Sequence, residues 1–379
     1  MSETVDELLM IPGPTDISRE VLKEMSSKTV AHYGEGWTEY YNETRSLIKD
    51  ILHTDNDIYL FVGSGHAAID ASLGSLLEDG DQVLVLSNGI FGDKLARISR
   101  LHKAEVTVLE KEWGKAFDPE RVDDFLDKSL NEYKAMLMVD VETSTGIRNP
   151  VKKLAEVAQK HELISFVDGV CSIGIEEFYM DEWNIDFCVT ASQKGLGAPP
   201  GLAMICLNDR VWQAIEARSD DIRGWYLNLE IMKEFEEKQK GWQPYGITMA
   251  VHNVMALKKA LELIKEEGLN NRIERHRESA KFLRKRVREI GMKVLAGEEQ
   301  ACNAVTAIKN PEGYDSSFII DKLQKKNIRI GNGLGELAGD YIRVGHMNQG
   351  AARINLYPVI SAFEEIIEER QDLQTVQNR

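Results

Sequence analysis

The sequence lacks long apolar runs and is poor in proline, and each shortage excludes a class of protein. Its longest apolar runs, such as 58–62 and 82–86, have the length of strands and fall far short of the roughly 20 residues of a membrane-spanning helix. Nine prolines among 379 residues argue against a collagen-like or disordered chain. Residues 1–16 carry neither the basic start nor the apolar centre of a secretory signal. We therefore expect a cytoplasmic protein with no membrane partner.

Basic residues are outnumbered by acidic ones, and cysteines are few. The chain has 46 Lys and Arg against 62 Asp and Glu, a net charge of −16, so its average surface repels phosphate backbones. We expect no nucleic-acid partner. The net charge does not exclude a local basic pocket. The four cysteines show neither a CxxC motif nor metal-ligand spacing, which favours buried free thiols over disulfides or a metal site: Cys171, Cys188, Cys206 and Cys302.

The length suggests two or three domains. In the first half, short apolar runs alternate with helical stretches, and most of these runs are apolar throughout, as expected for strands covered by helices on both faces. They predict an α/β fold with a mainly parallel sheet of about seven strands. The expected strands are 58–62, 82–86, 105–109, 135–140, 163–168, 185–190 and 202–207.

The second half turns helical and charged. One helix is predicted from Met249 to a C-terminal signal at Gly268, and a second runs through Ile290. A smaller α+β domain should follow. Its expected strands are 292–296, 303–308 and 341–345, with helices over 316–325 and around 359–369, where Pro358 is tolerable only near a helix start.

Ligands of open α/β sheets bind at the carboxyl ends of the strands, and three of these ends are unusual. Ser64, Gly65 and His66 lead from a strand into a helix, which suits a phosphate, although a plain turn uses the same residues. Asp168 ends an apolar strand, where it could cap a turn or hold a cationic ring nitrogen. Lys194 lies between two apolar strands among small residues, which suits either a surface lysine or a confined nucleophile.

A phosphate cradle, an acid and an enclosed lysine at successive strand ends describe a site for pyridoxal 5′-phosphate (PLP). The motifs, in order along residues 10–365, resemble the class V aminotransferases, and most closely their alanine–glyoxylate and serine–glyoxylate group. The motifs that carry the resemblance are PGPT at 12–15, GSGH at 63–66, ETSTG at 142–146, VDGV at 167–170, SQKGLGAPPG at 192–201 and IRVGHM at 342–347.

The resemblance implies roles for individual residues around the cofactor. Lys194 matches the lysine that binds PLP covalently and moves a proton, and Asp168 matches the acid that keeps the pyridine nitrogen protonated. The phosphate would be held by Ser64, Gly65, His66 and Gln193. The ring would lie between Val170 and Phe91, a position where close relatives often have tryptophan, with Ser144 near the ring oxygen.

It also implies how the substrate and a second subunit contribute. Arg343 matches the arginine that binds the substrate α-carboxylate, and Gly13 lies in the turn that lines the substrate pocket. Tyr245 and Thr248 match a pair that reaches the phosphate of the neighbouring subunit, which predicts a homodimer. The implied fold is type I of the PLP-dependent transferases. Its expected segments are an N-terminal segment near the active site and dimer interface (1–20), a large PLP-binding domain (21–264) and a small C-terminal domain (265–379).

The function that follows is transamination from alanine or serine to a 2-oxo acid such as glyoxylate or pyruvate. Other donors, namely aspartate, ureidoglycine or pyridoxamine, stay open, because donor choice depends on a few pocket side chains. Arg223 could recognise the second carboxylate of a dicarboxylate such as aspartate, or form a surface ion pair beside Asp220 and Asp221. A cysteine desulfurase is disfavoured, because Gln193 precedes the lysine where those enzymes usually have histidine and Cys302 lies in an apolar stretch. A binding protein without turnover would not need Arg343.

Overall fold

The computed structural model describes residues 7–377, with the main chain alone given for 370–377. Residues 1–6 and 378–379, and with them the outer ends of the first and third predicted segments, lie outside the described residues. Over the described range, no helix combines the length and the apolar character needed to cross a bilayer.

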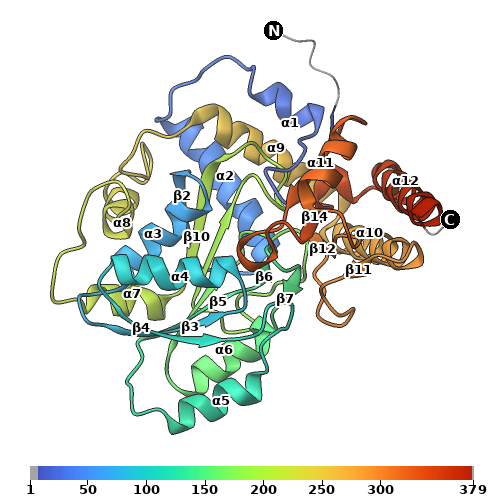
Figure 1. Ribbon diagram of the computed structural model, residues 1–379. Coiled ribbons are helices and arrows are strands. Elements are labelled where there is room, and N and C mark those ends of the chain that lie inside the picture. The colour runs from blue at the N-terminus through green and yellow to red at the C-terminus, as the bar shows by residue number, and fades with distance from the viewer. Residues whose placement is uncertain (1–6, 378–379) are drawn as a thin grey trace.

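A seven-stranded sheet forms the centre of the larger part of the molecule (Figure 1). Only β10 runs antiparallel to its neighbours in the described sheet. Every residue of the three adjacent central strands β9, β8 and β5 is buried, which explains why they read as uninterrupted apolar runs. The predicted α/β fold is confirmed. Across the sheet the order is β2 (Asp57–Gly63), β10 (Gly201–Leu207), β9 (Phe187–Ala191), β8 (Ile164–Asp168), β5 (Ala135–Val139), β3 (Gln82–Ser87) and β4 (Glu105–Glu110).

Helices follow and cover these strands. Because α3 begins two residues after β2 ends and α4 begins three residues after β3 ends, both helix N-termini lie at the carboxyl edge of the sheet. The helices of this part are α1 (Arg19–Glu24), α2 (Glu35–Leu52), α3 (Gly65–Leu76), α4 (Ile90–Leu101), α5 (Pro119–Lys128), α6 (Val151–Lys160), α7 (Asp209–Glu216), α8 (Leu229–Lys238) and α9 (Val251–Glu267). A two-stranded hairpin, β6 (Val141–Glu142) and β7 (Ile147–Arg148), projects beyond β5.

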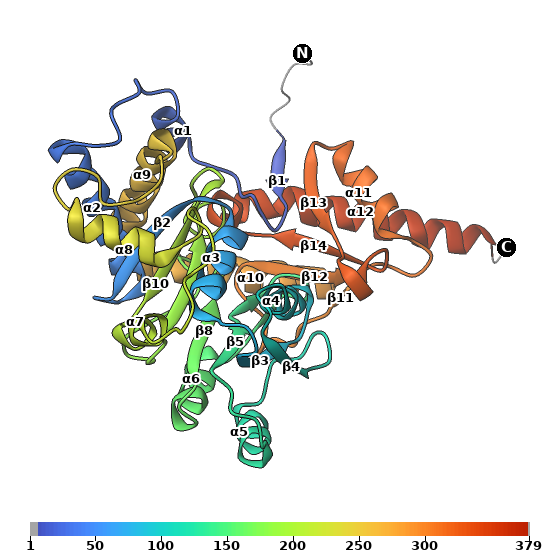
Figure 2. The same cartoon turned by 90° about the vertical axis from the view of Figure 1, so that its left-hand side faces the viewer.

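A smaller mixed sheet lies beside the first (Figure 2). Its order is β1 (Leu8–Met10), β13 (Ile328–Asn332), β14 (Tyr341–Gly345), β12 (Val305–Lys309) and β11 (Lys293–Val294). It packs with α10 (Leu269–Glu289), α11 (Ser316–Gln324) and α12 (Arg353–Gln377), and two short 3-10 turns, η1 (Gly335–Leu337) and η2 (Asn348–Ala351), flank β14. The parallel pair β1 and β13, with Leu8 opposite Ile328, was not predicted from the sequence.

Two separate hydrophobic cores underlie the two sheets. Val254 and Leu257 of α9 pack in the first core, whereas Leu283 of α10 packs in the second, together with Phe363 and Met10. The chain therefore changes core within α10, because Leu269 at its start still packs against the first core. The division into segments 1–20, 21–264 and 265–379 remains a proposal.

One helix start was predicted wrongly. The sequence placed a helix around 359–369 with Pro358 at its start, but α12 begins at Arg353 and contains Pro358. The proline ring removes one hydrogen bond, to the carbonyl of Ile354. Ile354 is exposed, so water can bind that carbonyl and the helix continues.

The second core gives a test of how firmly the N-terminal strand is held. Met10 is fully buried, so Met10→Ala should lower the free energy of unfolding by about 2–5 kcal/mol through lost burial and a residual cavity. Urea unfolding measures this. Leu130→Ala, at a residue 99% exposed, is the control and should change stability by less than about 0.5 kcal/mol. Equal midpoints for the two variants would contradict the packing described here.

Candidate active site

The carboxyl edge of the large sheet gathers most of the residues singled out from the sequence. Asp168 is the last residue of β8 and only 4% exposed. Its Oδ1 accepts a hydrogen bond from the main-chain N–H of Val170 at 3.0 Å. Burial raises the pKa of Asp168 to about 6, although this hydrogen bond and the charge of Lys194 act in the opposite direction. The carboxyl forms no ion pair with any described side chain, so it can still take a cationic partner.

Lys194 lies in the turn between β9 and β10. Its Nζ donates to the carbonyl of Pro12, in the N-terminal segment. Gly13 lies against the same side chain, because a Cβ at Gly13 would be only 2.4 Å from Nζ. The φ of Gly13, 112°, also favours glycine. The lysine is therefore enclosed by residues 12–13, and no described carboxylate pairs with it.

The start of α3 has the features expected of an anion site. Ser64 is the N-cap, but its hydroxyl accepts no hydrogen bond from the first turn of the described helix, and that turn contains no acidic residue. Gly65 packs on Val170, since a Cβ there would lie 2.8 Å from Val170 Cγ2. Partial desolvation and the charges of Lys94 and Lys194 lower the pKa of His66. Unpaired N–H groups at a helix start attract a phosphate.

Gln193 supplies an independent sign that a ligand belongs here. Its main-chain carbonyl accepts a hydrogen bond from Thr15 N at 3.1 Å. Its side-chain Oε1 is buried without any hydrogen-bond partner among the described residues. A buried amide oxygen without a partner is costly, and a bound group with a donor would satisfy it.

Phe91 and Ser144 are held by Glu142, a residue to which sequence reasoning gave no role. The buried Glu142 carboxylate accepts hydrogen bonds from Phe91 N at 2.9 Å and from Gly92 N at 3.2 Å, at the start of α4. The hydroxyl of Ser144 donates to the same carboxylate at 2.5 Å. Burial raises the pKa of Glu142. Its place after an apolar strand, like that of Asp168, could have identified it.

Arg343 comes from β14 of the smaller sheet and is 8% exposed. Its Nε donates to the carbonyl of Asn332 at 2.7 Å and its Nη1 to the carbonyl of Thr143 at 3.1 Å. Burial lowers its pKa, and no carboxylate among the described side chains pairs with it. A buried guanidinium that contacts only carbonyl groups keeps donors free for a carboxylate.

The buried thiol of Cys171 lies in a small hydrophobic cluster that contains Val141 after β5 and Val305 of the smaller sheet. Burial raises its pKa, and the charges of Lys194 and Asp168 both act on it. This cluster packs the loop that follows Asp168 against the smaller sheet, which carries Arg343 on β14.

Three residues lie elsewhere in the subunit. Tyr245 is fully buried, and its hydroxyl accepts a hydrogen bond from Trp37 Nε1 at 2.5 Å and donates to the carbonyl of His32. Thr248 is exposed. Arg223 is exposed and pairs at 3.3 Å with Asp79, which lies outside the group around Lys194. The contacts of Tyr245 and Thr248 with a second subunit remain a prediction.

The residues present fit PLP. An uncapped helix start and an unpartnered Gln193 oxygen suit its phosphate, an unpaired Asp168 suits its ring nitrogen, and an enclosed Lys194 suits its aldehyde. Phe91 is half-buried beside this region, and Lys94 Nζ lies 4.7 Å from the centre of its ring.

Comparison with known proteins agrees with this geometry. An uncharacterized aminotransferase of Methanocaldococcus jannaschii is 39% identical over 346 residues, which cover 91% of this chain and 89% of the relative. An (S)-ureidoglycine–glyoxylate transaminase of Bacillus subtilis is 31% identical, covering 95% of this chain and 90% of the relative. The crystal structure of an alanine–glyoxylate aminotransferase from Nostoc sp. matches with a TM-score of 0.92 at 30% identity, covering 96% of each chain.

The family model described as aminotransferase class V matches residues 9–366. This span contains the large sheet, the smaller sheet except Leu8, and all the site residues described above. The structural likeness gives the chain the type I fold of PLP-dependent enzymes. The resemblance inferred from the motifs is therefore confirmed, and the chain belongs to the class V aminotransferases, a family that uses PLP.

Proposed function

We propose that this enzyme binds PLP and transfers an amino group from alanine or serine to a 2-oxo acid such as glyoxylate or pyruvate. The observation that carries this proposal is the state of Arg343, a nearly buried cation whose described acceptors are two main-chain carbonyls. It offers one fork for one carboxylate. Arg223, the residue considered for a second carboxylate, is paired with Asp79, so small monocarboxylates are favoured.

The roles follow from the chemistry of each group. When bound, PLP supplies an electron sink for the substrate α-carbon. Lys194 holds it covalently and carries a proton, Asp168 keeps its ring nitrogen protonated, and Arg343 orients the α-carboxylate. Ser64, Gly65, His66 and Gln193 hold the phosphate. Val170 and Phe91 would pack against the two faces of the ring, Ser144 would lie near the ring oxygen, and Gly13 would border the substrate.

Sequence identity to the relatives does not determine the amino donor, because enzymes named for ureidoglycine and for alanine match at 31% and 30% identity. Aspartate and pyridoxamine are further alternatives. A desulfurase is disfavoured by Cys302, which is fully buried and donates from its thiol to the carbonyl of Val305 at 3.3 Å. Burial raises its pKa to about 12, so it is neither mobile nor a thiolate nucleophile.

A matrix of donors and acceptors tests the proposed reaction. Alanine and serine with glyoxylate or pyruvate should give the highest initial rates, compared as kcat/KM. Aspartate should be poorer because its distal carboxylate would enter the site without a cationic partner. A lead of more than about tenfold for aspartate, ureidoglycine or pyridoxamine would overturn the donor assignment while leaving the aminotransferase class in place.

Replacement of the lysine tests covalent attachment. Lys194→Ala should abolish both covalent cofactor binding and transamination with little loss of stability, because one amino group supplies attachment and proton transfer. Borohydride reduction followed by peptide mapping should label Lys194 in the wild type. Lys153→Ala, at an exposed lysine of α6, is the control and should keep the label. A label on any other lysine refutes the assignment.

Asp168→Asn should separate catalysis from stability. Its single-turnover rate should fall strongly, because an amide does not hold a protonated ring nitrogen. The apo variant should be the more stable form at high pH. In the folded protein the pKa of Asp168 is raised from 3.8 to about 6, so the wild type loses stability as pH rises through this window.

The expected gain of the apo variant is at most about 3 kcal/mol above pH 6, and it should vanish below about pH 4. Melting curves of the apo proteins across this range measure it. Asp140→Asn is the matched control: burial also raises the pKa of Asp140 to about 6, but Asp140 has no proposed contact with PLP. Near-normal half-reaction rates in Asp168→Asn would contradict its role.

A homodimer is proposed from the same family pattern. Exposed Tyr33 and Trp242 stack with ring centres 5.2 Å apart beside the segment of Tyr245 and Thr248, and such exposed aromatic side chains are typical of interfaces. Light scattering on the holoenzyme should give twice the mass of the chain. A fully active monomer would refute a composite site.

A further inference from the structure

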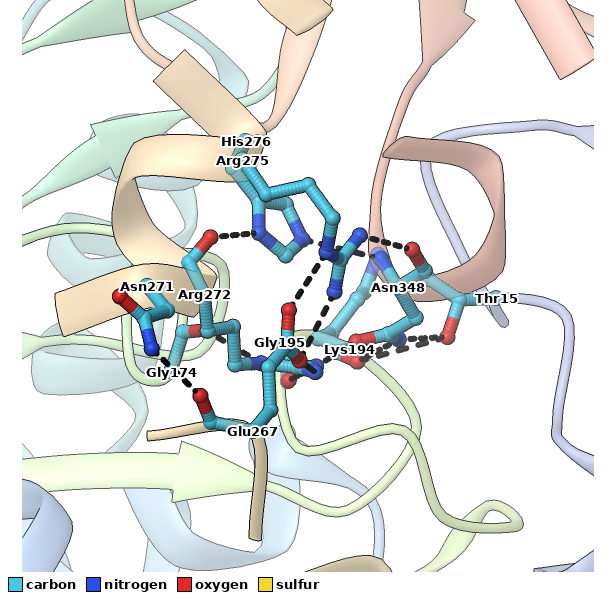
Figure 3. Close-up of polar contacts among 10 residues, drawn as sticks. All are labelled: Thr15, Gly174, Lys194, Gly195, Glu267, Asn271, Arg272, Arg275, His276 and Asn348. Atoms are coloured by element: carbon cyan, nitrogen blue, oxygen red, sulfur yellow. Dashed lines mark hydrogen bonds and ion pairs between the residues drawn. The ribbon is translucent and has the colours of Figure 1, made fainter. Parts of the chain in front are cut away.

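Behind Lys194, four distant segments of the chain meet at Arg272 and Asn348 (Figure 3). They are the N-terminal segment at Thr15, the loop that follows Asp168, the loop that carries Lys194, and the turn η2 that follows β14. The contacts of Arg272 and Asn348 involve no side chain to which the sequence analysis or the proposed function gives a role.

Arg272, near the start of α10, joins the two catalytic loops through their main chains. Its Nε donates to the carbonyl of Gly174 at 2.9 Å, and its Nη2 donates to the carbonyl of Gly195 at 2.8 Å and to Asn348 Oδ1. Its Nη1 pairs with Glu267 at 3.1 Å. Burial lowers the pKa of Arg272 to about 10, so it remains a cation at neutral pH. A planar fork can make all these bonds at once, whereas an ammonium cannot.

Asn348 holds the lysine from the other side. Its Nδ2 donates to the carbonyl of Lys194 at 2.7 Å and to Thr15 Oγ1 at 2.6 Å. Its main-chain N–H donates to His276 Nε2 at 3.0 Å, and its carbonyl accepts from Arg275 Nη1 at 2.7 Å. Asn348 has a φ of 54°, an uncommon conformation for a residue other than glycine. Hydrogen bonds on all its polar groups fix this conformation.

The two catalytic loops touch through glycines. A Cβ on Gly195 would lie 2.1 Å from the carbonyl oxygen of Ile173, and one on Gly174, with φ 81°, would lie 3.0 Å from the carbonyl oxygen of Gly195. The loop of Lys194 therefore lies directly on the loop of Asp168. Main-chain atoms of the two loops are in direct contact, so a shift of one loop displaces the other.

The same contacts reach the strand that carries Arg343. Asn348 begins η2, three residues after β14 ends at Gly345. The carbonyl of Lys194 is thus tied to the small-sheet strand from which Arg343 extends, and through Arg272 to the loop of Asp168. Lysine, acid and arginine come from three elements, and this cluster joins all three.

We propose that Arg272 and Asn348 are positioning residues that fix the main chain of Lys194 relative to Asp168 and Arg343. This inference rests on the proposed role of Lys194 in the site. The two side chains touch neither substrate nor cofactor. They fix the position of the lysine amino group relative to the guanidinium of Arg343. An error of about 1 Å in such a placement can cost a factor of about 100 in rate.

Two variants remove the proposed contacts without forcing a new backbone. Asn348→Gly keeps a residue that adopts positive φ freely and removes the bonds to Lys194, Thr15 and Arg272. Arg272→Lys keeps the charge and removes the fork. The control is Arg277→Lys on the same helix, where the arginine pairs with Glu177 and Glu274 at the surface.

Kinetics of the holoenzyme and hydrogen exchange of the apo protein test the inference. Both variants should lower kcat by about 100-fold, with little change in the KM of the donor. In the apo protein, the amide of Gly197, which donates to the carbonyl of Lys194 at 3.0 Å, should exchange faster than in the control. The exchange measurement needs neither cofactor nor turnover.

The possible results distinguish a positioning role from a purely structural one and from failure of the proposed function. Lower melting temperatures with a control-like kcat and control-like exchange at Gly197 would mean a structural role only, and would overturn the inference. If borohydride fails to label Lys194 in the wild type, the proposed function fails and the inference fails with it. A labelled wild type with control-like variants would overturn the inference alone.

Discussion

The site depends on three ionisable groups that have no ion-pair partner among the described side chains. Arg284, by contrast, is buried to a similar degree as Arg343 but is neutralised by Glu298 at 2.6 Å. Asp168, Lys194 and Arg343 instead contact main-chain groups. Desolvated charges without partners are unfavourable, so a bound group with complementary charges would remove this cost.

Main-chain contacts and residues outside the site hold these groups in position. Glu142 holds the start of α4 by its N–H groups, and Arg272 and Asn348 hold carbonyls of the lysine loop. The side chains that would meet PLP are thereby left with free hydrogen-bonding atoms, as Gln193 shows. Recognition and support are separated, which is the arrangement that preorganised sites require.

The large sheet could be predicted because strands buried on both faces read as apolar runs, and Asp168 and Lys194 stood out because they are polar residues at the ends of such runs. The strands β1 and β13 could not be predicted. β1 has only three residues, and its pairing with β13 joins residues about 320 positions apart, from Leu8 to Ile328. Arg272 and Asn348 were missed for the same reason, since a hydrogen bond to a distant carbonyl leaves no local pattern. The motif of Tyr245 gave its family role but not its bond with Trp37.

The pairing of β1 with β13 also sets an order of events during synthesis. The large sheet is complete once residue 207 has been made, and domains generally fold as they emerge. Pro12 and Gly13, which enclose Lys194, are carried by a strand whose partner begins only at Ile328. The strand that precedes Pro12 and Gly13 therefore gains its partner strand more than a hundred residues after the large sheet is complete, and the smaller sheet is the later of the two to form.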